Sequence, residues 1–494
     1  MDVAKYIKQL GSETIIYGIS GTISRFIGIF LIPLYTRVFS PADYGVIALV
    51  ASLVELVSTF IVLGLDNSSG RWFYDSDDTG QRKRIISSWF WCQALMGVIA
   101  ALIISLFAHQ IAGSLLDSSQ YATVIRVAAL MIPLGTFSKV FGNWLRYQRR
   151  AWMTMIYFTT SSLGTIGLIA LFVLVWGQGL VGLYWAQVTA AVLMALVVVA
   201  VFKSWIAPQY VSWTLLKEML VFGLPLVPAS IASWVRASSD RFILQMFSET
   251  SEVGLYAIAG TIASGVALIT GAFQMAWGPF AFSILHEIDS VRVYSKVLSV
   301  YSLLGCLLGT AVSLFAPLFL QLLTTPDYFP AVSCVPYLAF SYLVVGAIYI
   351  VAIGSSIAKK STPIAVSIFT GAGVNALLNF VLIPCFGREG AAFSALLSNI
   401  CALAYLYSAS QKNYHIPYQL KDALICFGFS WLLIGIDHFF IPTSGLAAFG
   451  ARVSMCLLFV PLAFWLRIIK PDQVRLLFAY AGCRVRKVID YEFR

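Results

Sequence analysis

The chain has 494 residues, of which 60% are hydrophobic and only 11% are charged, and its mean hydropathy is +0.86. These values exclude an ordinary soluble globular protein, in which about a quarter of the residues are charged. The formal net charge of +10 is spread over separate short loops, so it does not indicate a nucleic-acid-binding surface. The composition predicts a polytopic membrane protein.

A helix needs about 20 mainly apolar residues to cross the hydrocarbon core of a bilayer. By that rule we expect an all-α protein with fourteen membrane-spanning helices. In chain order they cover residues 14–37, 43–65, 86–109, 121–145, 153–176, 180–203, 218–246, 253–284, 296–323, 330–357, 363–384, 390–410, 421–440 and 446–468. The first span lacks a small-x-small cleavage site after a short apolar core, so we expect it to be retained.

The basic residues predict the orientation, because cytoplasmic loops are enriched in Lys and Arg. If the N-terminus lies in the cytoplasm, the outside loops hold only Arg37 and Arg388. The inside loops then hold basic clusters such as residues 82–84 and 146–150, and the tail after residue 466 holds seven more cations. We therefore expect both termini to be cytoplasmic.

Internal repetition predicts the domain organisation. The stretch "FVLVWGQGLVGLYWA" (172–186) aligns with "FVLIPCFGREGAAFS" (380–394) at an offset of 208, and Arg149-Arg150 corresponds to Lys359-Lys360 at 210. Such matches in one order favour duplication of a six-helix unit, with the two halves related by an axis along the membrane normal. The predicted parts are an N-terminal half, a C-terminal half, an additional helix pair and a basic tail: residues 1–210, 211–412, 413–470 and 471–494.

Charged residues within the spans point to the functional site, which in two-half bundles lies between the halves near mid-membrane. Each such charge costs roughly 2.5–3.5 kcal/mol or more at the bilayer centre, so it generally faces a cavity or a partner. The spans contain eight of them: Arg25, Glu55, Arg126, Lys139, Arg236, Asp240, Arg241 and Arg452.

Helical spacing separates the central charges from the peripheral ones. Arg25 lies on a stripe of small and polar residues, Glu55 lies on a similar stripe, and Ser233, Arg236 and Asp240 share one face of the seventh span. Arginine offers a planar fork that suits phosphate and carboxylate oxygens. Several central cations with few acids therefore predict a cavity that selects an anionic head group.

Structural alternatives stay open for most of these charges. Arg452 is expected to snorkel to a membrane face, and Arg126 and Lys139 to snorkel or to line the cavity. Asp240 has an alternative role as the ion-pair partner of Arg236 or Arg241. Glu55 has the corresponding alternative role of neutralising Arg25.

Four further stretches carry a family resemblance: "IPLYTRVFSPADYGVIALV", "GLDNSSGRWFYD", "GLPLVPASIASWVRASSDRFIL" and "EVGLYAIAGTI". They resemble the signatures of bacterial polysaccharide flippases of the Wzx type, in the superfamily that also holds lipid II flippases and MATE drug exporters. The resemblance implies a V-shaped, MATE-like bundle in the bacterial inner membrane. It implies a non-enzymatic activity, the movement of an undecaprenyl-diphosphate-linked oligosaccharide from the cytoplasmic to the periplasmic leaflet by alternating access.

The resemblance also implies site residues and partners. Arg25 and either Arg236 or Arg241 would hold the diphosphate, and Arg71 matches by motif at the cytoplasmic mouth. Glu55 is the mid-membrane acid of the first half that could carry a coupling proton, with H⁺ and Na⁺ both open as coupling ions and no other cofactor expected. Membrane lipids and a polysaccharide polymerase are the expected partners, and nucleic acid is not.

Two other functions remain open. A MATE-like exporter of cationic small molecules would need membrane acids, and the first span has none between Glu13 and Asp43. A membrane scaffold for polysaccharide assembly would use the basic tail, which is expected to lie on the anionic inner leaflet. A scaffold would tolerate neutral residues at positions 25 and 236, whereas a diphosphate carrier would not.

Overall fold

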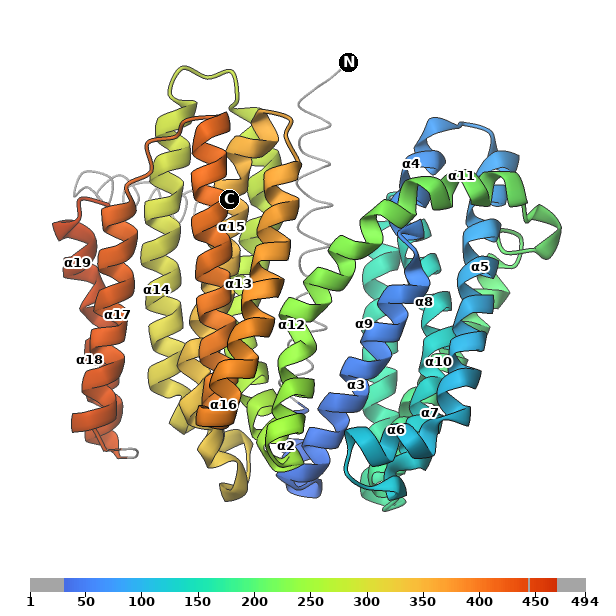
Figure 1. The fold of residues 1–494 in the computed structure, drawn as a ribbon, viewed down its shortest axis with the longest axis horizontal. Coiled ribbons are helices and arrows are strands. Elements are labelled where there is room, and N and C mark those ends of the chain that lie inside the picture. Colours follow the sequence, from blue (N-terminus) through green and yellow to red (C-terminus); the bar gives the residue numbers. More distant parts are fainter. Residues whose placement is uncertain (1–30, 443–444, 469–494) are drawn as a thin grey trace, which may run out of the picture.

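The computed structural model describes residues 31–442 and 445–468, and every regular element within them is a helix. The helices form two bundles that meet near α2 (Ile32–Val38) and splay apart towards the end that carries α4 (Leu65–Asp75) and α11 (Trp213–Gly223) (Figure 1). Two long helices, α3 (Pro41–Val62) and α12 (Val227–Phe247), run between the bundles. The predicted all-α, V-shaped architecture is confirmed.

Each bundle consists of consecutive segments of the chain. The N-terminal bundle contains α5 (Thr79–Leu106), α6 (Ala108–Leu115), α7 (Ala122–Ala129), α8 (Met131–Tyr147), α9 (Ala151–Ile169) and α10 (Gly179–Phe202). The C-terminal bundle contains α13 (Thr250–Ser283), α14 (Ser290–Leu323), α15 (Val335–Ile357), α16 (Thr362–Asn413), α17 (Leu420–Phe440), α18 (Leu446–Leu457) and α19 (Phe459–Trp465). Short helical turns connect them: η1 (Ser119–Tyr121), η2 (Ala170–Val175), η3 (Pro208–Tyr210), η4 (Leu224–Leu226) and η5 (Pro326–Cys334).

The described residues contain twelve helical segments that are long and apolar enough to cross a membrane. One of them, α16, has 52 residues and is interrupted at Gly387, whose φ of 53° is not helical. Its two parts run antiparallel, because Ser367 donates a hydrogen bond to the carbonyl of Ala402 (3.0 Å). The predicted first span, 14–37, lies mostly outside the described residues, as does Arg25.

The turns within the two halves match at the offset found in the sequence. Gly179 and Gly387, 208 positions apart, both have left-handed backbones with φ of 56° and 53°. Arg149 and Lys359, 210 positions apart, are both left-handed as well, with φ of 54° and 55°. After Arg149 and after Lys359 the next residue's N–H bonds to a carbonyl five positions earlier, which is the helix-ending pattern of a Schellman motif. The residue bounds of the halves stay a prediction.

The bundles meet where α3 crosses α13. Ser40 caps α3 with a capping box, in which its hydroxyl accepts from the Asp43 N–H and the Asp43 carboxylate accepts from the Ser40 N–H. One turn later, a Cβ at Gly45 would overlap the Thr250 carbonyl oxygen, and a Cβ at Gly254 would overlap the Pro41 carbonyl oxygen. Glycine at both positions therefore permits a backbone-to-backbone contact between the two helices.

The helix α11 packs with the N-terminal bundle although it leads into α12. Its Leu216 and Met219 are buried in one hydrophobic cluster with Phe73 of α4 and Trp89 of α5. The chain then turns through η4 and crosses to the C-terminal bundle as α12 (Figure 1). The predicted seventh span, 218–246, is thus divided into two helices that pack in different places.

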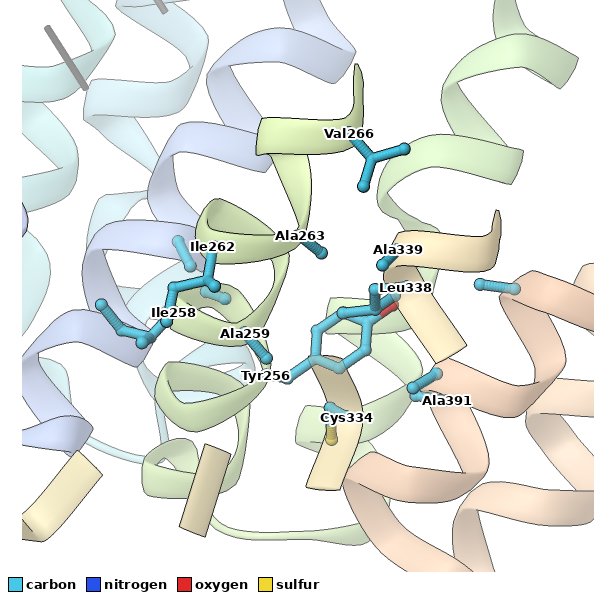
Figure 2. Close-up of a cluster of buried hydrophobic side chains, with 14 of the residues drawn as sticks. Tyr256, Ile258, Ala259, Ile262, Ala263, Val266, Cys334, Leu338, Ala339 and Ala391 are labelled. Atoms are coloured by element: carbon cyan, nitrogen blue, oxygen red, sulfur yellow. The ribbon is translucent and has the colours of Figure 1, made fainter. Parts of the chain in front are cut away.

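Part of the core of the C-terminal bundle lies between α13 and α15. Figure 2 shows small and branched side chains of α13, such as Ala259 and Ala263, facing Leu338 and Ala339 of α15. Tyr256 lies among them and is 4% exposed. Its hydroxyl is the polar end of this apolar core, and it reaches the carboxylate described next.

Candidate functional site

Three ionisable side chains of α12 line one cavity inside the C-terminal bundle. They are Arg236, Asp240 and Arg241, and the cavity has a volume of 200 Å³. We call it the α12 cavity. Its other polar lining residues come from α13, α15 and α16: Tyr256, Ser341, Tyr342 and Asn399. Residues four apart lie on one face of a helix, so the shared face predicted for positions 236 and 240 agrees with this arrangement.

Arg236 stands between two cavities. Its Nη1 donates to Asn399 Oδ1 (2.7 Å), and its buried Nε has no hydrogen-bond partner among the described residues. Arg236 also lines a second cavity of 140 Å³ together with Ser233 and Tyr349. A guanidinium can donate five hydrogen bonds, so Arg236 retains donors that a ligand could use.

Asp240 is held by neutral donors. The carboxylate is 4% exposed, and it accepts hydrogen bonds from the Tyr256 hydroxyl and from the Arg241 backbone N–H (2.9 Å). Among the described residues, no ion pair within 4.0 Å joins it to Arg236 or Arg241. The pairing considered from the sequence is therefore not the arrangement found, because neutral donors occupy both carboxylate oxygens.

Two hydrogen bonds join α12 to α3 beside the cavity. The Arg241 Nη1 donates to Ser52 Oγ (2.8 Å), and the Ser238 hydroxyl donates to Glu55 Oε2 (3.2 Å). Ser52 is fully buried, and the Nε of Arg241 is buried without a partner in the part of the chain that the structure describes. Glu55 thus contacts α12, while its predicted neighbour Arg25 lies outside the described residues.

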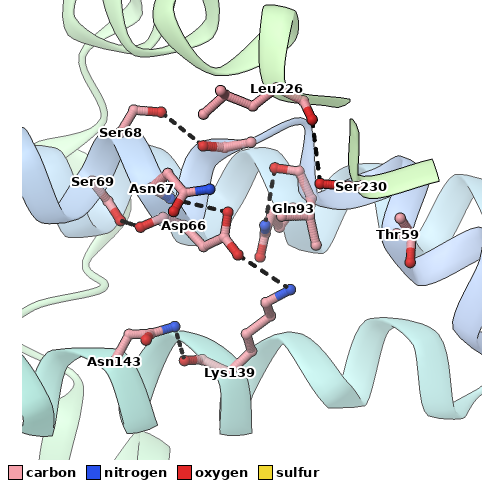
Figure 3. A network of polar contacts seen from close by, with 12 residues as sticks. Thr59, Asp66, Asn67, Ser68, Ser69, Gln93, Lys139, Asn143, Leu226 and Ser230 are labelled. Carbon is pink, nitrogen blue, oxygen red and sulfur yellow. Dashed lines mark hydrogen bonds and ion pairs between the residues drawn. The ribbon is translucent and has the colours of Figure 1, made fainter. Parts of the chain in front are cut away.

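Lys139 belongs to a different polar cluster, in the N-terminal bundle. Its Nζ lies 3.9 Å from Asp66 Oδ2 at the start of α4, and both side chains are about one-third exposed, at 39% and 34% (Figure 3). The Tyr147 hydroxyl donates to the Asp66 carbonyl (3.1 Å), which ties α4 to α8. Lys139 therefore faces a loosely held acid and is not part of the α12 cavity.

The two remaining predicted cations are exposed. Arg71 on α4 is 64% exposed, with its Nε 3.9 Å from Asp75 and its guanidinium 5.7 Å from the ring of Phe222. Arg126 on α7 donates to the Ser105 carbonyl at 3.4 Å. The structure therefore brings together Arg236, Asp240 and Arg241 with Glu55 beside them, and it places Lys139, Arg71 and Arg126 elsewhere.

The expectation for Arg452 is wrong. Its side chain does not snorkel but is 4% exposed, and its Nε lies 2.8 Å from Asp437 Oδ1 on α17. The reason is a partly buried acid on the neighbouring helix, which makes burial of the charge less costly than a stretch to the membrane face.

The sequence of this chain matches the profile of a known protein family. The profile of a family described as polysaccharide biosynthesis protein matches residues 34–333, which is more than half of the chain. The chain belongs to this family. The resemblance inferred from the four sequence stretches is thereby confirmed.

This polysaccharide biosynthesis protein has two similar relatives of described function. It is 24% identical over 238 residues to the succinoglycan biosynthesis transport protein ExoT of Rhizobium meliloti, and the match covers 47% of this chain and 45% of ExoT. It is 26% identical over 373 residues to the probable flippase AglR of Haloferax volcanii, and the match covers 72% of this chain and 74% of AglR. This chain therefore matches less than half the length of ExoT.

Solved structures share the fold of this polysaccharide biosynthesis protein. The lipid II flippase MurJ in an inward closed conformation matches with a TM-score of 0.73 and 14% identity, over 92% of this chain and 99% of MurJ. An inward-facing multidrug resistance MATE transporter of the MOP superfamily matches with a TM-score of 0.66 and 14% identity, over 81% of this chain and 94% of its own. At these identities the likeness establishes the fold, which confirms the predicted MATE-like bundle.

Proposed function

We propose that the chain flips an undecaprenyl-diphosphate-linked oligosaccharide from the cytoplasmic to the periplasmic leaflet of a bacterial inner membrane. The observation that carries the proposal is the α12 cavity with its two arginines. No carboxylate lies within 4.0 Å of either guanidinium among the described residues, so their charges are available to an anionic ligand. The family, and the names of the two relatives and of MurJ, support a lipid-linked substrate.

The chemistry of the cavity suits a diphosphate. Each guanidinium presents a planar fork that matches two phosphoryl oxygens and stays charged at every relevant pH. Both have a buried Nε without a partner in the described part of the chain, and both rest against neutral groups, Asn399 and Ser52. An anion that reaches them gains charge-assisted hydrogen bonds and displaces only neutral acceptors.

Alternating access would turn this binding into transport. The bundles splay at the α4 and α11 end and meet at the opposite end. From the distribution of basic residues we expect the splayed end to face the cytoplasm. Outward opening requires that Arg241 leave Ser52 and that Ser238 leave Glu55, because these bonds join the helices that must separate. A diphosphate oxygen that attracts Arg241 would loosen this link, so occupancy of the cavity would favour opening.

The other predicted residues receive secondary roles in this proposal. Lys139 and Arg71 would attract the anionic head group at the cytoplasmic end, and Arg25 would add a cation from the first span. Glu55 and Asp240 would serve coupling or gating, with H⁺ or Na⁺ as the coupling ion. The interior-negative potential would help an anion to move outward by about 2.3 kcal/mol per charge per 100 mV.

The test of this proposal compares an arginine that lines the α12 cavity with an arginine on the surface. Arg236 is replaced by Ala and by Lys, and Arg292, which is 86% exposed, is replaced by Ala as the control. The measurement is delivery of lipid-linked oligosaccharide to the outer leaflet in a strain that lacks its own flippase, at equal membrane abundance. Loss with Ala, partial activity with Lys and normal delivery in the control are expected.

Both alternatives give a different outcome in the same strain. A scaffold for polysaccharide assembly, with a polymerase as its partner, would not restore delivery of the substrate in this strain even as the wild-type chain. A MATE-like exporter of small molecules would not complement the strain with the wild-type chain.

A further inference from the structure

Asn399 is a buried amide that contacts the central arginine from another helix. It lies on the second part of α16 and is 4% exposed. Its Oδ1 accepts from Arg236 Nη1 (2.7 Å), while its Nδ2 donates to Ser341 Oγ (2.8 Å) and to the Ala395 carbonyl (2.9 Å). Three elements, α12, α15 and α16, therefore meet at one side chain.

The hydrogen bonds of Asn399 are compatible with only one orientation of its side-chain amide. A guanidinium has no acceptor, so the oxygen of Asn399 must face Arg236, and the Ala395 carbonyl has no donor, so the nitrogen must face that carbonyl. The Ser341 hydroxyl has a further contact with the Ala395 carbonyl (3.2 Å). Asn399 is thus locked on its own helix and on α15, and it presents a fixed acceptor to Arg236.

The backbone of α16 also fits the stem of the arginine. A Cβ at Gly371 would lie 3.1 Å from Arg236 Cδ and 3.3 Å from Ala402 Cβ. A larger residue at 371 would push the stem away from α16. Gly371 and Asn399 therefore place the outer stem and the guanidinium of Arg236 against one helix hairpin.

The neutrality of Asn399 matters as much as its position. A carboxylate at 399 would form a buried ion pair and would compensate the charge of Arg236. The amide instead provides a hydrogen bond without a charge, so the guanidinium is oriented and its positive charge stays available.

We propose that Asn399 is a positioning residue for Arg236, which orients the guanidinium and preserves its charge for a phosphoryl oxygen of the substrate. This inference rests on the proposed function. Ser341 supports Asn399 by accepting a hydrogen bond from its amide nitrogen.

The test measures binding of inorganic diphosphate to the purified full chain by titration calorimetry, with the thermal unfolding midpoint of every variant recorded alongside. Asn399→Asp keeps the acceptor and adds a negative charge, so we expect its affinity for diphosphate to fall about tenfold or more. Ser341→Ala keeps every charge and frees the amide, so we expect a smaller loss. Arg236→Gln removes the cation and sets the baseline.

The decisive variant is Arg236→Gln combined with Asn399→Asp. If Asn399 acts through the charge of Arg236, adding Asn399→Asp to the Arg236→Gln chain changes diphosphate affinity by less than about twofold. A structural role, or direct repulsion of the anion by the new carboxylate, would preserve the full effect in that background and would overturn the inference.

The controls separate this inference from the proposed function. If Arg236→Gln itself binds diphosphate as the wild type does, the proposed head-group site fails. If Arg236→Gln loses binding while Asn399→Asp and Ser341→Ala bind normally, only the positioning role fails. If Asn399→Asp does not fold, Ser341→Ala still tests the positioning role. An unchanged affinity of Ser341→Ala for diphosphate would contradict the role of the fixed amide.

Discussion

The contact between α3 and α13 yields a prediction about the balance between conformations. Gly45 and Gly254 allow these helices to touch through their backbones at the end where the bundles meet. Replacing Gly45 by Ala would place a Cβ on the Thr250 carbonyl oxygen and 2.9 Å from Thr250 Cγ2. Because the first of these atoms is backbone, the overlap can be relieved only by moving the helices apart, by on the order of 1 Å.

The size of the effect follows from the cost of overpacking. Inserting a methyl group into a packed contact costs roughly 1–3 kcal/mol. Under alternating access this contact belongs to the conformation that is splayed at the α4 and α11 end. A penalty confined to that conformation would shift the population towards the opposite one by about 5- to 150-fold.

The assay is a distance measurement between spin labels at two exposed positions, Arg84 and Lys359, which lie in different bundles at the splayed end. We expect Gly45→Ala to increase the population of short distances. Gly164→Ala is the matched control, because a Cβ there meets nothing within 4 Å. A Gly45→Ala chain that folds and gives the same distance distribution as the control would refute the reasoning, and Gly254→Ala repeats the test from the other helix.

Three further perturbations test separate contacts. Asp437→Asn should lower the unfolding temperature, because it leaves the charge of Arg452 buried without its acid, at a cost of about 3–5 kcal/mol; an unchanged midpoint would contradict the buried pair. Ser52→Ala removes the acceptor of Arg241 on α3, so the spin-label distances should shift in the direction expected for the glycine variant, and no shift would show that the bond does not hold the helices together. Lys139→Ala should lower the free energy of unfolding by less than about 1 kcal/mol, since its ion pair with Asp66 is long and partly exposed. Delivery of the lipid-linked substrate should nevertheless fall. Normal delivery would show that Lys139 has no role in attracting the substrate.

The parts of the fold that were predictable depend on patterns that are local in sequence. Apolar runs of about 20 residues mark most spans because each helix must satisfy its own backbone in lipid. Ser40, Pro41 and Asp43 mark the start of α3 because a capping box needs residues of those types at that spacing. The packing of α11 with the N-terminal bundle was not predictable, since its hydropathy is continuous with that of α12 and only the contacts of Leu216 and Met219 separate the two helices.

The candidate site was predictable only through its charges. A charged residue within a span is costly wherever the chain folds, so Arg236, Asp240 and Arg241 can be found from the sequence alone. Their partners carry no such signal. Asn399 lies 163 positions from Arg236 along the chain, and Ser341 lies 58 positions from Asn399. Both are neutral side chains of ordinary type, so a search of the sequence for charged residues finds neither.

The need to keep cations available also explains why, in the described part of the chain, Asp240 forms no ion pair with Arg236 or Arg241. In a low-dielectric interior an arginine can be compensated by a carboxylate, as Asp437 compensates Arg452 on the periphery. Among the described residues around the α12 cavity the acceptors are instead an amide and a hydroxyl, and the buried acid Asp240 is satisfied by Tyr256 and by a backbone N–H. A peripheral helix pair that only has to stay folded gains from neutralising its charge. Under the proposed function the α12 cavity has to attract an anion and release it, which requires cations that are only partly satisfied.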